Sequence, residues 1–167
     1  MTNLPATPSS TDSGRQLLRH AVATVAYRGG KVLRGAPEGF SSFTVGEGGR
    51  SAGAILTHLG DLIHWAFSMV NGRREWHDSE PDSWNVEVAR FYSALSVLDA
   101  YLASNHPLRA PIDKLFQGPV ADALTHVGQL AMMRRLAGAP IKSENYYVAD
   151  IAAGRVGPDQ VAPKREF

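Results

Sequence analysis

Four long segments of the chain repeat apolar residues at the spacing of an α-helix, and no segment shows the apolar and polar alternation of a half-buried β-strand. The segments cover residues 13–36, 51–71, 83–104 and 119–137. Each would form a helix with one apolar face that must be buried against a neighbour. The sequence therefore predicts an all-α protein built as an antiparallel four-helix bundle.

The chain has 167 residues, which suits a single domain with a substantial core. We expect residues 1–12, rich in Pro, Ser and Thr, to be a flexible lead-in, and residues 13–155 to form the bundle domain. Ser143 is a candidate cap for a short extra C-terminal helix over residues 143–151. Residues 156–167 read as an extended or flexible tail.

The composition excludes several classes of function. Lys and Arg number 17 against 16 Asp and Glu, so no strong field attracts phosphate backbones or an anionic membrane surface. We expect neither a nucleic-acid nor a membrane partner, and the lack of a signal-peptide pattern makes a cytoplasmic location the expectation. There is no Cys, so disulfides, thiolate metal sites and a cysteine nucleophile are excluded.

The fourth predicted helix places side chains of the metal-ligand type on its buried side. At about 100° per residue, Asp122, His126, Gln129 and Met133 share one narrow strip. Burying a carboxylate and an imidazole without partners would cost roughly 1 to 3 kcal/mol each. Since residues four apart lie one helical turn apart, Asp122 and His126 can bind the same ion.

The second predicted helix supplies a third candidate ligand, because His58 lies at the centre of its buried face. Asp61 is about 60° away around the helix, where it either orients a ligand or is simply exposed. His64 falls on the opposite, small and polar face, and we predict that it is not a ligand. A metal-free alternative is a buried, hydrogen-bonded ion pair of Asp122 with His126 that links the two helices.

These residues carry a resemblance to a known family. Over roughly residues 12–150 the chain resembles the DinB/YfiT-like family of bacterial four-helix-bundle metalloenzymes. The matching motifs are Ile55-Leu56-Thr57-His58-Leu59-Gly60-Asp61, preceded by Arg50-Ser51, and His126-Val127-Gly128-Gln129-Leu130, followed by Met133-Arg134-Arg135-Leu136.

The resemblance implies a divalent metal held by three side chains, usually all histidine, with an open position for water or substrate. His58 matches the histidine of the second helix, and His126 matches the second of the pair on the fourth. Asp122 stands where the family has a histidine. A set of two histidines and one carboxylate suits iron and is also compatible with zinc, nickel or manganese.

The resemblance also implies a reaction, namely transfer or isomerisation of a small-molecule substrate with a low-molecular-weight thiol as cosubstrate. In this hypothesis the metal stabilises the thiolate, and Gln129 or Asp61 orients ligands or substrate. Hydrolysis is the other reaction considered, and family members often form homodimers. The alternative is a noncatalytic bundle that binds a small ligand or a partner and has a degraded metal site.

Overall fold

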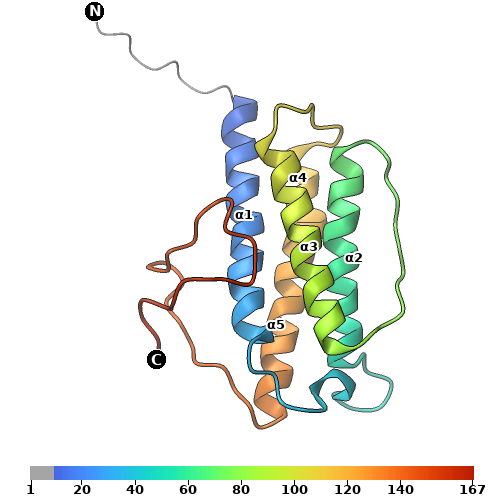
Figure 1. Ribbon diagram of the computed structural model, residues 1–167, viewed down its shortest axis with the longest axis vertical. Coiled ribbons are helices and arrows are strands. Elements are labelled where there is room, and N and C mark those ends of the chain that lie inside the picture. The colour runs from blue at the N-terminus through green and yellow to red at the C-terminus, as the bar shows by residue number, and fades with distance from the viewer. Residues whose placement is uncertain (1–9) are drawn as a thin grey trace, which may run out of the picture.

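The computed structural model describes residues 10–167, and its described part contains four long helices and three short helical turns (Figure 1). This confirms the prediction of an all-α four-helix protein. The long helices are α1 (Ser10–Leu33), α2 (Ala52–Val70), α3 (Trp84–Ala103) and α5 (Ala121–Leu136). The short ones are η1 (Phe40–Ser42), α4 (Ile112–Leu115) and η2 (Phe116–Val120).

The start of the chain differs from the prediction. Residues 10–12, expected to belong to a flexible lead-in, form the first turn of α1. Residues 1–9 of that lead-in lie outside the described residues. Within residues 10–167, no helix combines the length and the apolar character needed to cross a membrane.

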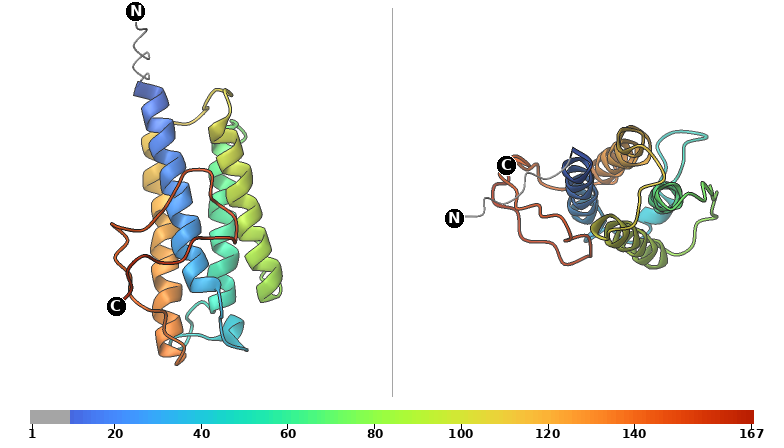
Figure 2. Two further views of the ribbon diagram at one scale, coloured as in Figure 1. Left: turned by 60° about the vertical axis from the view of Figure 1, so that its left-hand side comes forward. Right: turned by 90° about the horizontal axis from the view of Figure 1, so that it is seen from above.

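Each long helix packs against two of the others, with α1 and α2 both in contact with α3 and α5 (Figure 2). Residues 71–83 run back along the bundle, so that α2 and α3 point in the same direction (Figure 1). Accordingly, the backbone N–H of Arg109, which follows α3, bonds at 2.9 Å to the carbonyl of Val70 at the end of α2. The antiparallel order that we predicted therefore applies to α1 with α3 and to α2 with α5, whereas the other two neighbouring pairs are parallel.

The core lies where the four apolar faces meet. Ser51 caps the start of α2 by accepting a 3.1 Å hydrogen bond from the backbone N–H of Ala54, and this sets where the helix begins. Burial confirms that each long helix turns an apolar face inward. On α2, however, this face includes the fully buried Leu56, Leu59 and Ile63, and His58, which we predicted at its centre, is only partly buried. Among the largest fully buried side chains are Leu56, Leu59, Ile63, Phe91, Leu95, Leu98, Leu102 and Leu130.

The C-terminal segment corrects one prediction and decides between the two alternatives of another. The short helix expected over residues 143–151 does not form, and this stretch consists of an isolated bridge and turns. The backbone N–H of Asn145 bonds at 3.1 Å to the carbonyl of Arg165, and that of Phe167 bonds at 2.9 Å to Ser143. The pairing between the two ends of the segment uses backbone N–H and C=O groups that a helix would need for its own hydrogen bonds, so the bridge forms in place of the helix.

Side chains fasten this segment to α1, over which it runs (Figure 2). The buried carboxylate of Glu144 accepts hydrogen bonds from Tyr27 Oη at 2.6 Å and Lys31 Nζ at 2.8 Å. Lys31 Nζ also donates to Glu166 at 2.8 Å, and Val156 is part of the core. Residues 156–167 are therefore bound to the bundle without forming a helix, which agrees with the extended alternative of our prediction and not with the flexible one.

Candidate metal centre

Two neighbouring helices bring three side chains together at one point of the bundle. His58 comes from α2, whereas Asp122 and His126 come from the first turns of α5. One ligand atom from each side chain lies within 4.8 Å of the others. The two imidazole rings lie with their centroids 4.7 Å apart and almost perpendicular, at 86°. Thus the three residues that the sequence selected as candidate ligands form one cluster.

The distances within this cluster are too long for hydrogen bonds and suit a shared cation. His126 Nε2 lies 3.5 Å from Asp122 Oδ1, and His58 Nε2 lies 3.9 Å from Asp122 Oδ2. A hydrogen bond would require about 2.7 to 3.2 Å. Two ligand atoms of a tetrahedral metal with bonds of about 2.1 Å are roughly 3.4 Å apart. Asp122 therefore makes no direct hydrogen bond to either histidine, and the three groups could hold a cation between them.

The ring of His126 is held in the orientation that a metal ligand needs. Its Nδ1 lies 2.7 Å from Gln129 Oε1, one turn further along α5. Because the amide oxygen can only accept, Nδ1 is the donor, and in a neutral ring this leaves the lone pair on Nε2, which faces Asp122. Gln129 thus makes the contact that the sequence hypothesis requires of a residue orienting a ligand.

His58 has surroundings that keep its ring neutral. Burial lowers the pKa of His58, and the nearby His126 and Arg50 lower it further, whereas Asp122 and Asp61 act in the opposite direction. Only 17% of its side chain is exposed. The ring of Trp76 packs edge-on against His58 with centroids 5.7 Å apart. A neutral imidazole is the form that binds metal, so this environment fits a ligand.

Asp61 is neither exposed nor bonded to the three candidate ligands. It is buried and accepts hydrogen bonds from the backbone N–H of Ser79 at 3.0 Å and from Ser79 Oγ at 2.7 Å. Arg90 Nη1 also donates to it at 2.7 Å. Burial by itself raises the pKa of Asp61, but the hydrogen bonds from Ser79 and Arg90 outweigh it and lower that pKa. Its contacts attach residues 71–83 to α2.

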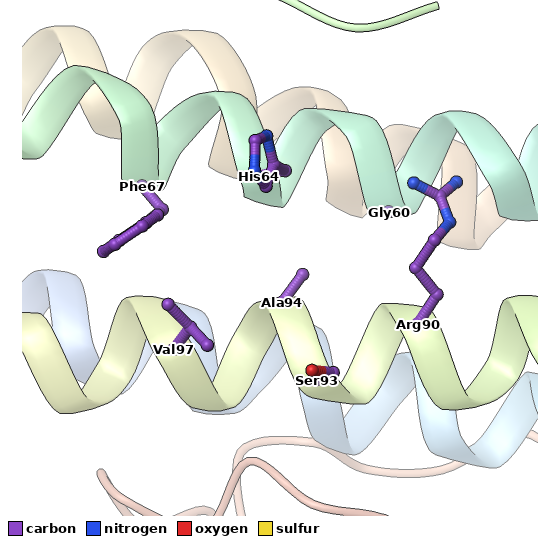
Figure 3. A pocket seen from close by; sticks show the side chains of 7 residues that line it. All are labelled: Gly60, His64, Phe67, Arg90, Ser93, Ala94 and Val97. Atoms are coloured by element: carbon purple, nitrogen blue, oxygen red, sulfur yellow. The ribbon is translucent and has the colours of Figure 1, made fainter. Parts of the chain in front are cut away.

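His64 lines a separate hollow of about 340 Å³ between α2 and α3 (Figure 3). Figure 3 shows Arg90 reaching from α3 towards α2 beside Gly60, with Phe67 and Val97 at the other end of the hollow. His64 Nδ1 is buried and has no hydrogen-bond partner among residues 10–167. His64 is not one of the three residues of the cluster.

The sequence reasoning did not assign individual roles to two residues beside the cluster. Arg50 lines hollows on both sides of it, and Trp76 covers His58. A usable signal existed for Arg50, because it directly precedes the N-cap Ser51 and so lies at the start of the helix that carries His58. No such signal existed for Trp76, whose place depends on the path of residues 71–83.

Comparison of the chain with protein-family models, with curated proteins and with solved structures finds no match. The argument for function therefore rests on the cluster of His58, Asp122 and His126 and on its surroundings.

Proposed function

We propose that this protein is a divalent-metal-dependent enzyme of the DinB-like type, which transfers or isomerises a small-molecule substrate with a low-molecular-weight thiol. The observation that carries the proposal is the convergence of two Nε2 atoms and one carboxylate within 4.8 Å. In proteins of this architecture, side chains from facing helices commonly build metal sites in the bundle.

The donor set fits a divalent cation of the first transition series. His58, Asp122 and His126 would hold it, leaving further positions for a cosubstrate. When bound, such a cation acts as a Lewis acid that favours the anionic form of a thiol at neutral pH. Zinc, nickel, iron and manganese all accept this combination of ligands.

Two of the chain's own residues support this chemistry. Gln129 Oε1 accepts a hydrogen bond from Nδ1–H of His126, which leaves Nε2 available to bind a metal. Trp76 packs on His58 and limits the access of water from that side. The chain contains no cysteine, so the reacting sulfur must belong to a cosubstrate that enters from solvent.

The direct test is the metal content of the purified protein. We expect about one divalent cation per chain, lost in His126→Ala and retained in His20→Ala, which removes an exposed histidine outside the cluster. Turnover of a thiol with an electrophile should require the same metal. Wild-type protein that carries no metal would contradict the proposal. A metal-loaded protein with no turnover would favour the noncatalytic ligand-binding alternative.

A further inference from the structure

A hollow of about 420 Å³ lies directly beside the cluster, with His126 and Gln129 in its wall. Its other walls come from the far half of α5 and from the loop before α2. Val45, Met132 and Leu136 contribute apolar side chains that are 51%, 54% and 55% exposed and lie together in this one hollow. The size is typical of a site for a small molecule, and the lining selects an apolar body.

One permanent charge stands in this wall, and it belongs to Arg50. Arg50 is exposed and forms no hydrogen bond or ion pair with the described residues 10–167. On its other side it borders a smaller hollow of about 190 Å³ that also contains His58. Its charge is close enough to His58 to help lower the pKa of that ring. An unpaired guanidinium therefore borders both the apolar hollow that contains His126 and the smaller hollow that contains His58.

We propose that the substrate is an amphipathic monocarboxylate, whose apolar body occupies the 420 Å³ hollow and whose carboxylate binds Arg50. This inference rests on the proposed function, because it treats the hollow as the substrate side of the metal centre. The planar guanidinium matches a carboxylate through two parallel hydrogen bonds. The apolar walls then place the remainder of the molecule next to His126.

A singly charged carboxylate fits the site at Arg50 better than a doubly charged phosphate. Arg50 is the one cation in the wall, so a doubly charged group would stay partly unneutralised. Asp78 and Glu80 line the smaller hollow on the other side of Arg50 and would repel a second charge. A monocarboxylate neutralises the guanidinium and meets less of that repulsion than a doubly charged group would.

The test uses octanoate as the probe, with the full chain as purified and again after treatment with a chelator. Calorimetry should show that octanoate binds more tightly than acetate, which lacks the apolar body, and than octanol, which lacks the charge. Arg50→Gln should weaken octanoate binding about tenfold and leave octanol binding unchanged. Arg50→Lys should retain part of the affinity. Arg135→Gln, which removes an exposed cation from a different hollow on α5, should change neither.

Val45→Ser changes the apolar wall without touching Arg50, and it should weaken octanoate and octanol alike. An octanoate affinity that is unchanged in both Arg50→Gln and Val45→Ser would overturn the inference. So would a homodimer that covers this hollow, dissociates in Val45→Ser and excludes octanoate. Metal-loaded protein without Arg50-dependent octanoate binding would overturn the substrate class alone. Metal-free wild-type protein would instead overturn the proposed function and with it the substrate role of this site.

Discussion

Arg90 reaches across from α3 to Asp61 on α2, with Nη1 2.7 Å from Oδ1. The lack of a side chain on Gly60 makes this approach feasible, because a Cβ there would lie 2.8 Å from the guanidinium carbon of Arg90. The same carboxylate accepts two hydrogen bonds from Ser79. A single buried acid thus connects α2, α3 and the segment of residues 71–83, which carries Trp76 to His58.

Asp61→Asn should therefore reduce stability and leave metal affinity per folded molecule essentially unchanged. The substitution removes the charge of a buried carboxylate and weakens its hydrogen bonds with Ser79 and Arg90. We expect the free energy of unfolding to fall by about 2 kcal/mol in urea titrations. Glu75→Gln is the control, since Glu75 pairs with Arg73 at 3.9 Å in an exposed position and should change stability by less than about 1 kcal/mol. A large loss of metal affinity in Asp61→Asn would assign Asp61 to the metal centre instead.

Removing His64 should reduce the sensitivity of the fold to acid. Burial lowers the pKa of His64 from 6.5, with His77 and Arg73 acting in the same direction. The unfolded chain therefore binds more protons at this residue as the pH falls through 6.5, and the folded state loses stability in that window. Urea midpoints at about pH 7.5 and pH 5.5 should differ less in His64→Gln than in the wild type. An equal difference in both proteins would contradict the inferred shift.

Gln129→Leu should weaken metal binding without unfolding the protein. The substitution removes the acceptor that holds the Nδ1 proton of His126, and loss of such a contact typically lowers affinity 10- to 100-fold. Competition with a chromogenic chelator would measure it. Gln16→Leu, an exposed glutamine on α1, is the matched control and should bind metal like the wild type. Equal affinity in both variants would mean that Gln129 does not orient the ring.

The cluster could be predicted from the sequence because the helical spacing of residues determines which side chains share a face with each of its three members. Asp122 and His126 are four residues apart on one helix, so their common face follows from helical geometry alone. His58 required one further assumption, namely that the buried faces of two helices meet. The bundle supplies that meeting through the contact of α2 with α5.

Periodicity could not predict the features that depend on distant partners. Asp61 lies at an intermediate angle on α2, and its burial depends on Arg90 arriving from α3. The parallel arrangement of α2 and α3 depends on the path of residues 71–83, which carry no repeating pattern. The helical potential of residues 143–151 was overridden because Glu144 binds side chains of α1 that are more than 100 positions earlier in the chain.

Lys31 offers a test of how strongly the C-terminal segment is fastened. Lys31→Met would leave the carboxylate of Glu144 buried, with Tyr27 as its remaining hydrogen-bond donor among the contacts described here. Removing one member of a buried ion pair typically costs about 3 kcal/mol or more, and we expect a loss of that size in the free energy of unfolding. Lys142→Met is a matched control, because Lys142 also pairs with Glu166 but is 74% exposed. It should change stability by less than about 1 kcal/mol.

The stability of the double variant Lys31→Met with Glu144→Gln distinguishes two explanations for the expected loss of stability in Lys31→Met alone. If the cost comes from an uncompensated buried charge, replacing the carboxylate with a neutral amide should recover part of the lost stability. If the cost comes from lost packing of the Lys31 side chain, the second substitution should add to the damage. Urea unfolding of the wild type, both single variants and the double variant closes the cycle, and a purely additive loss would refute the charge explanation.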